Sequence, residues 1–482
     1  MSQQSLASRA VAAVALMIGF YLLALTVVGA LLFIPYAEWH WADRIHIKLA
    51  LGCIVSAAVI LWSILPRIDR FEAPGPRLEP GDHPELFDVL RGVARDTGQE
   101  MPSEVYLINE VNAWVSQRGG IMGFGGRRVM GLGLPLMQTT TVSQFRAILA
   151  HEFGHYHGGD TKLGPWIYKT RVAIGRTLQS LDDDGFIHKP FEWYGNFFMR
   201  VTQAISRAQE LAADRLAAQV AGARTMIDAL VAVERAGMAY DAFFRNELVP
   251  VLANGYKPPV AAGFSRFLAA ENVATSLKEA VDESLREGKS DVYDSHPPLR
   301  ERVAALEALV PAGNPAEREP FAASLLRQLA RFEEALLRAM LTDPSMELRD
   351  VQWEETGTAV FLPVWRQSAG EHADALRDLT AGDLPTLVAP DATFWQRLKL
   401  GEVSPEERTY AVKGILGAAL SARLHDTGWM CDAAPGKAIA FSRDGRTIEP
   451  FVAVAKLNTR ELTPEAWTEE CRAAGIDRLT LG

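Results

Sequence analysis

Cysteine is scarce in this chain. Only three cysteines, Cys53, Cys431 and Cys471, occur in 482 residues, and they lie far apart in the sequence. Thiols that are so few and so scattered exclude a disulfide framework and a cysteine-ligated zinc cluster. Any metal site in this protein must therefore use histidine and carboxylate ligands.

The chain also lacks a basic arm or patch. Its 49 Lys and Arg residues are outnumbered by 59 Asp and Glu residues, which gives a net charge of −10. Proteins that bind nucleic acid carry clustered positive charge, so we expect no nucleic-acid partner. Internal repeats and low-complexity tracts are absent too, and the length is sufficient for roughly two or three domains.

Charged residues are missing from positions 10–36. As a helix this run would extend ~40 Å, which exceeds the hydrocarbon core of a bilayer. A second apolar run over 45–65 is just long enough to span, and Tyr36, Trp39 and Trp41 are placed in the connecting loop as an aromatic belt. A cleaved signal peptide is the alternative, but the first run is too long for one and a second span follows it.

Basic residues flank the outer ends of the two runs. Arg9 precedes the first, whereas Arg67, Arg70 and Arg77 follow the second. The positive-inside rule then places both termini in the cytoplasm. We therefore expect residues 1–71 to form a two-span anchor in a lipid bilayer, with the rest of the chain on the cytoplasmic side.

Residues 151–155 have the sequence HEFGH, near the end of a predicted helix that begins near Thr141 or Ser143, either of which can cap it, and that ends at Gly158-Gly159. Positions four apart lie on one helix face, so His151 and His155 can reach a single ion with Glu152 beside it. This spacing is typical of a zinc site. A string this short also arises by chance, so the rest of the chain has to supply its context.

A catalytic zinc needs three protein ligands and one open position for water. Glu210 and Asp214 lie four apart on a second predicted helix. Alone, such a pair is more often a solvated helix face. If Glu210 is the third ligand, Asp214 lies one turn away, where it can accept the second ring N–H of a ligating histidine.

Three motifs occur in order and together resemble a known family. They are H-E-x-x-H after a strand that contains Asn112-Ala113, S-R-x-x-E-x-x-x-D over 206–214, and S-H-P-P-L over 295–299 with Arg302. Over roughly residues 82–305 the chain resembles the integral-membrane zinc metallopeptidases of the HtpX and CAAX prenyl endopeptidase type, which are gluzincins.

The resemblance implies one Zn²⁺ per chain, bound by His151, His155 and Glu210. It implies that Glu152 is the catalytic acid and base, which takes a proton from a zinc-activated water and delivers it to the leaving amine. It also implies that Asp214 is the hydrogen-bond partner of a ligand histidine.

Two further roles follow by analogy. His296 could donate to the oxyanion or to substrate, with a structural histidine at a helix start as the equal alternative. Asn112, Ala113 and Trp114 match the strand that receives a polypeptide substrate by β-strand addition. An ordinary core strand is the alternative for Trp114.

The predicted fold is α+β: two N-terminal transmembrane helices and a mainly helical zincin catalytic domain over residues 72–310, with a small antiparallel sheet formed by residues 105–115 and 128–137. A mixed α/β accessory domain of unknown role follows over residues 321–482. The broken helical segment 163–205 has too many charges to span a bilayer, so we favour core packing over a lid or lipid-contacting role.

We therefore predict a membrane-anchored zinc endopeptidase of the cell inner membrane with a cytoplasmic catalytic domain, acting in membrane protein quality control. HtpX-type proteins usually have further spans after the H-E-x-x-H helix, and this chain shows only the two N-terminal ones. Prenyl-protein processing is therefore not expected. The alternative is a non-proteolytic scaffold with a structural zinc, which would not need Glu152. The sequence does not indicate an oligomeric state.

Overall fold

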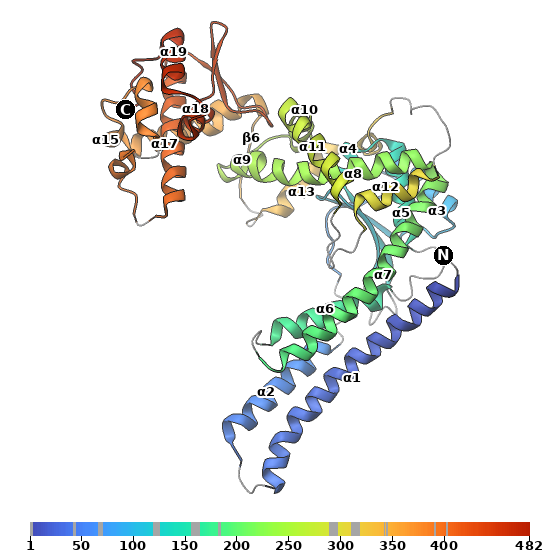
Figure 1. The fold of residues 1–482 in the computed structure, drawn as a ribbon. Coiled ribbons are helices and arrows are strands. Elements are labelled where there is room, and N and C mark those ends of the chain that lie inside the picture. Colours follow the sequence, from blue (N-terminus) through green and yellow to red (C-terminus); the bar gives the residue numbers. More distant parts are fainter. Residues whose placement is uncertain are drawn as a thin grey trace. The chain divides into compact units, whose positions relative to one another are not determined.

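The computed structural model describes most of the chain as two compact units (Figure 1). The first unit is Met1–Gly237 with Glu279–Ala339, and the second is Met238–Lys278 with Met340–Gly482. Only the backbone is described for residues 3–10, 164–166 and 168. The described ranges are 3–41, 45–65, 71–118, 126–155, 164–181, 185–288, 297–309, 319–341, 343, 346–389, 392–401 and 403–482.

The predicted α+β class is confirmed, with two apolar N-terminal helices and small sheets among many helices. The units do not coincide with the predicted domain boundaries at 71, 310 and 321, which stay predictions. The helices of the first unit, including α8 and α11, which continue into the second, are α1 (Gln3–Trp41), α2 (Ile47–Ile64), α3 (Pro84–Thr97), α4 (Leu134–Thr139), α5 (Val142–Gly154), α6 (Gly164–Ser180), α7 (His188–Ala221), α8 (Ala223–Phe243), α11 (Glu271–Glu287), α12 (Leu299–Glu307), the 3₁₀ turn η3 (Ala322–Leu325) and α13 (Leu329–Met340).

Helices α1 and α2 pack side by side, and both are long and apolar enough to cross a membrane. Large apolar side chains such as Leu22, Leu51 and Trp62 remain exposed on them, as lipid-facing residues would be. One detail differs from the sequence prediction. Helix α1 continues to Trp41, so the aromatic residues expected in a loop belong to its last turns, because no helix-breaking residue follows Pro35.

Helices α6 and α7 lie along this anchor (Figure 1). The Tyr194 hydroxyl donates to the Leu16 carbonyl at 2.6 Å, and the Ser63 and Thr177 hydroxyls share a buried hydrogen bond of 2.7 Å. The opposite face of α7 leaves Trp193 69% exposed. The 163–205 segment therefore packs on the anchor with one face only.

The sheet of the first unit has the strand order β1-β2-β4-β3, which makes β3 an edge strand. Residues 105–115 form two strands because the chain reverses at 109–112. As a result β2 runs parallel to β4, while β3 pairs with β4 antiparallel. The sheet is therefore mixed: β2 and β4 pair in parallel, and the other described pairings are antiparallel. The strands are β1 (Arg77–Leu78), β2 (Glu104–Ile108), β3 (Ala113–Arg118) and β4 (Arg127–Gly133).

Helix α5 is capped as its sequence predicts. The Thr141 hydroxyl accepts from the Gln144 N–H at 3.3 Å, and the Gln144 side chain accepts from the Thr141 N–H at 2.9 Å, a capping box. The helix ends at Gly154, and the Gly158-Gly159 end predicted for it lies outside the described residues. Phe145 and Phe153 are fully buried and fix the helix in the core.

The second unit is mainly helical with two small sheets. Ser404 caps α17 (Pro405–Asp426) with Glu407 in a capping box, and Asp444-Gly445 form the hairpin turn between β8 (Ala440–Arg443) and β9 (Arg446–Ile448). Its remaining elements are η2 (Phe244–Leu248), α9 (Val249–Ala253), β5 (Tyr256–Lys257), α10 (Val260–Ala269), β6 (Arg349–Asp350), η4 (Trp353–Glu355), η5 (Thr356–Phe361), α14 (Leu362–Glu371), α15 (Ala373–Leu376), η6 (Ala381–Asp383), α16 (Leu384–Leu387), η7 (Phe394–Leu398), α17 (Pro405–Asp426), β7 (Met430–Asp432), β8 (Ala440–Arg443), β9 (Arg446–Ile448), α18 (Pro450–Thr459) and α19 (Pro464–Ala474).

Candidate metal centre and active site

The site forms where α5 and α7 cross. Gly154 permits the crossing to be close, because a Cβ added there would lie 2.9 Å from the Ala213 Cα. The close approach directs Glu210 and Asp214, in the C-terminal half of α7, toward the histidines of α5. Residues that are far apart in the sequence are thereby brought to one point of the structure.

His151, His155 and Glu210 converge as the sequence predicts. One ligand atom from each lies within 4.8 Å of the other two. His151 Nε2 is 3.5 Å from Glu210 Oε2, and His155 Nε2 is 3.4 Å from Glu210 Oε1. Two imidazoles and a carboxylate are the donors of many catalytic zinc sites, so the donor set and its spacing fit Zn²⁺.

Access to this centre is from the His155 side. The side chain of His155 is 30% exposed, whereas those of His151 and Glu210 are 7% and 6% exposed. The partial exposure of one ligand leaves an approach for water, as a catalytic metal centre requires. A fully enclosed structural site would lack that opening.

Asp214 lies behind His151, with its oxygen Oδ1 2.8 Å from the histidine Nδ1. Burial alone would raise the pKa of Asp214, but hydrogen bonds from Arg302 and His151 outweigh it and hold the pKa below the usual value. The ionised carboxylate accepts the Nδ1 proton, so Nε2 is the nitrogen directed at the metal position. The predicted pairing of Asp214 with a ligand histidine is present in the geometry.

The pKa of His151 is raised to about 9. Burial lowers it, but the hydrogen bonds to Asp214 and Glu210 outweigh burial and favour the imidazolium. A metal requires the neutral ring, so metal binding at neutral pH must displace a proton from His151.

Glu152 is half-buried and lines a cavity of about 260 Å³ beside the metal ligands. The cavity has mostly apolar walls with His151 and Glu152 among its polar lining. Such a concave, largely apolar space with a few polar groups is where ligands commonly bind. Its lining residues are Asn112, Ala113, Leu136, Ile148, His151, Glu152, Met226, Leu230, Val233, Glu234, Pro297, Leu299 and Arg302.

The predicted substrate strand divides into two roles. Asn112 and Ala113 line the cavity, and β3 is the edge strand of its sheet. Trp114 does not line the cavity; its indole lies over Gly131, where an added Cβ would be 2.4 Å from the Trp114 Cε2. Trp114 is half-buried over the sheet face, and its predicted substrate role stays a prediction.

His296 lies outside the described residues, so its role stays a prediction. Its neighbour in the motif, Arg302 on α12, was given no role by the sequence reasoning although it contacts Asp214 directly. The sequence does contain a signal for this contact: Arg302 lies next to the apolar stripe Leu299, Val303 and Leu306. A cation beside a buried helix face needs a buried acidic partner.

Comparison with known proteins finds similar sequences over about half of the chain. Residues 80–310 match the family model described as peptidase family M48. The chain is 24% identical over 288 residues to the protease HtpX homolog of Chlorobium phaeobacteroides (strain BS1), spanning 55% of this chain and 80% of the relative. It is also 24% identical over 280 residues to protease HtpX of Hahella chejuensis (strain KCTC 2396), spanning 53% and 82%. No solved structure matches the chain.

Proposed function

Residues 80–310 belong to peptidase family M48, and from this premise we propose that the chain is a membrane-anchored zinc endopeptidase. The observation that carries the proposal is the convergence of His151, His155 and Glu210 donor atoms within 4.8 Å, beside a cavity lined by Glu152. His151, His155 and Glu210 would hold the Zn²⁺, one ion per chain.

The mechanism assigns a proton task to Glu152. When bound, zinc acts as a Lewis acid that polarises water and the scissile carbonyl. Glu152 accepts the proton of the attacking water and passes it to the leaving amine, which is the usual task of a carboxylate beside such a site. Asp214 keeps the Nδ1 proton of His151 in place, and Arg302 holds Asp214 through two hydrogen bonds.

The substrate is a polypeptide in extended form. In the described part of the sheet β3 is an edge strand, the position at which an extended chain can be added, and Asn112 and Ala113 line the cavity at its start. Backbone pairing accepts many sequences, while the apolar cavity walls favour an apolar side chain next to the cleaved bond. In this proposal His296 donates a hydrogen bond to the oxyanion or to substrate.

The membrane location rests on α1 and α2. Both pass the length and composition criteria for spanning helices, and flanking arginines favour a cytoplasmic catalytic domain by the positive-inside rule. With the anchor in the cell inner membrane, a protease of broad sequence tolerance suits membrane protein quality control. Residues 72–310 form the catalytic domain in this proposal, and residues 321–482 form an accessory domain.

Replacing Glu152 with Gln tests the proposal against a scaffold with structural zinc. The full-length protein in detergent is given an unfolded polypeptide, and zinc content is measured on the same sample. We expect cleavage to fall by about 10²-fold or more with zinc retained, because glutamine cannot accept the proton. Glu301→Gln, which changes an exposed acid of α12 outside the cavity lining, is the matched control. Equal cleavage by Glu152→Gln and the unaltered protein would refute the mechanism.

A further inference from the structure

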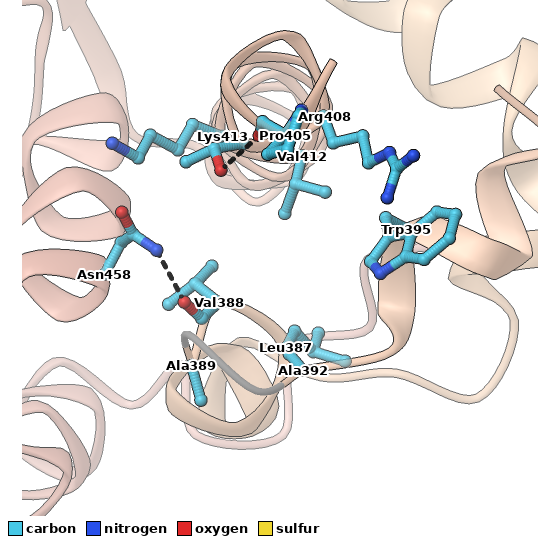
Figure 2. Close-up of a pocket in the computed structure, with 11 residues that line it drawn as sticks. Leu387, Val388, Ala389, Ala392, Trp395, Pro405, Arg408, Val412, Lys413 and Asn458 are labelled. Carbon is cyan, nitrogen blue, oxygen red and sulfur yellow. Dashed lines mark hydrogen bonds between the residues drawn. The ribbon is translucent and has the colours of Figure 1, made fainter. Parts of the chain in front are cut away.

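A second cavity, of about 210 Å³, lies within the second unit between α16, η7, α17 and α18 (Figure 2). It is smaller than a typical small-molecule site, which measures ~300–1,000 Å³. The cavity can hold a group about as large as one amino-acid residue. Its lining residues are Leu387, Val388, Ala389, Ala392, Trp395, Pro405, Arg408, Thr409, Val412, Lys413 and Asn458.

The cavity has an aliphatic wall and a polar wall of nearly equal extent. Leu387, Val388 and Val412 are buried and present aliphatic side chains to it. In Figure 2, Val412 points down from α17 toward Val388 and Leu387 on the opposite wall. An aliphatic group placed between these walls would be removed from water, and this burial of apolar surface favours binding.

Arg408 is fixed at one side of the cavity. Its guanidinium carbon lies 4.3 Å from the centre of the Trp395 ring, a cation–π contact. Its Nε donates to the Val403 carbonyl at 3.1 Å. A guanidinium held by two contacts loses little freedom when it binds an anion, so this arginine is pre-organised.

Lys413 stands on the other side of Val412 on the same helix (Figure 2). Across the cavity, the Asn458 amide donates to the Val388 carbonyl at 2.8 Å and fixes that wall. No carboxylate is among the described lining residues, and within the described chain neither Arg408 nor Lys413 has an ion-pair partner. In a chain of net charge −10, a cavity with one aliphatic wall and two cations that have no acidic partner among the described residues favours an anionic ligand.

We propose that this cavity binds a carboxylate that carries one apolar side chain. The carboxylate pairs with Arg408, and the side chain lies between Val412 and Leu387. Two sources offer this chemistry: a free small acid, or the C-terminal residue of a polypeptide. Nothing in the proposal depends on proteolysis by the first unit.

The test uses full-length protein in detergent and isothermal calorimetry. The small probe is N-acetyl-L-leucine, compared with its neutral amide; the peptide probe is a short polypeptide ending in leucine, compared with its C-terminal amide. We expect at least one acid to bind about tenfold or more tighter than its amide, and Arg408→Gln to weaken that acid by a similar factor. Arg446→Gln, on β9 outside the cavity, should leave binding unchanged.

The two probes separate the sources. If the peptide acid binds, the cavity recognises polypeptide C-termini. If only N-acetyl-leucine binds, the cavity is a site for a small acid. Because Arg408→Gln also removes a contact of Trp395, Lys413→Gln provides a second variant, expected to weaken the acid by a smaller factor at an unchanged melting temperature. If neither acid exceeds its amide in affinity, or if both cation variants bind as the unaltered protein does, the proposal is overturned.

Discussion

Arg302 holds Asp214 with two nitrogens: Nε lies 2.8 Å from Oδ2, and Nη2 lies 2.6 Å from Oδ1. The aspartate side chain is 1% exposed, and the arginine side chain is 12% exposed. A buried carboxylate with this bidentate partner is stabilised as the anion. The arginine thereby acts on the metal centre through Asp214 and His151 without being a metal ligand.

Arg302→Gln should therefore weaken zinc binding. Without the guanidinium, the buried Asp214 loses its bidentate partner and keeps only the hydrogen bond with His151, and its hold on the His151 tautomer loosens. We expect zinc affinity to fall about 10- to 100-fold and the free energy of unfolding to drop by about 3–5 kcal/mol. Chelator competition measures the first effect, and chemical denaturation measures the second.

A nearby arginine provides the control for this variant. Arg300 lies on the same helix, is exposed, and donates to the Arg286 carbonyl at 3.1 Å. Arg300→Gln should change zinc affinity by less than about twofold, since a surface contact contributes little. Equal zinc affinities for the two variants would contradict the role given to Arg302.

Zinc affinity should rise with pH. The pKa of His151 is raised from 6.5 to about 9, so the ring is protonated at neutral pH and one proton must leave when the metal binds. Apparent affinity is expected to increase about tenfold per pH unit below that pKa and to level off above it. Chelator competition between about pH 6 and pH 9 measures this slope.

The same shift sets the sign of a stability change. Because the folded pKa of His151 exceeds the unfolded value of 6.5, its contribution to the stability of metal-free protein is complete below that unfolded value. The contribution is lost as the pH rises through about 9. Asp214→Asn should move the pH dependence of zinc affinity and the pH dependence of stability to lower pH. If zinc affinity in this variant changes with pH as it does in the unaltered protein, a group other than His151 titrates.

Gly154→Ala should separate α5 from α7. The added Cβ would lie 2.9 Å from the Ala213 Cα, and a backbone atom cannot yield as a flexible side chain can. We expect a loss of about 1–3 kcal/mol in unfolding free energy together with weaker zinc binding. Gly175→Ala on α6, where an added Cβ meets nothing within 4 Å, should instead stabilise the protein by about 0.5–1 kcal/mol. Zinc binding that survives Gly154→Ala intact would show that the close crossing is not needed.

The exposed face of α7 should contact lipid. Trp193 and Phe197 stack with ring centroids 6.0 Å apart and are 69% and 45% exposed, while Tyr194 on the other face bonds to α1. Aromatic residues favour the membrane interface. In nanodiscs with brominated lipid, Trp193→Phe should remove part of the quenched tryptophan fluorescence. Trp467→Phe, a buried position of the second unit, should leave the quenched fraction unchanged, and identical quenching in both variants would place Trp193 in water.

Local patterns carried much of the prediction. The i, i+4 spacing of His151 and His155, and of Glu210 and Asp214, depends only on helix geometry, and it reappears in the structure as one cluster. The capping boxes at Thr141 and Ser404 are likewise decided within four residues. Such features are visible in the sequence because their partners are neighbours along the chain.

Long-range pairings were not visible in the sequence. The contact of Arg302 with Asp214 joins residues 88 positions apart, and the parallel pairing of β2 with β4 depends on where the chain reverses between them. The second unit combines residues 238–278 with 340–482, which no periodicity within either segment reveals. These features arise from packing between distant segments, which a single sequence does not specify locally.

Helix α7 is one uninterrupted rod of 34 residues. It is tied to α1 at Tyr194, and it carries Glu210 about 24 Å further along its axis. The length of α7 therefore sets the distance between the proposed active site and the bilayer. Under the proposed function, cleavage is confined to segments that protrude from the membrane to that height, so the distance of a peptide bond from the lipid selects the substrate as much as its sequence does.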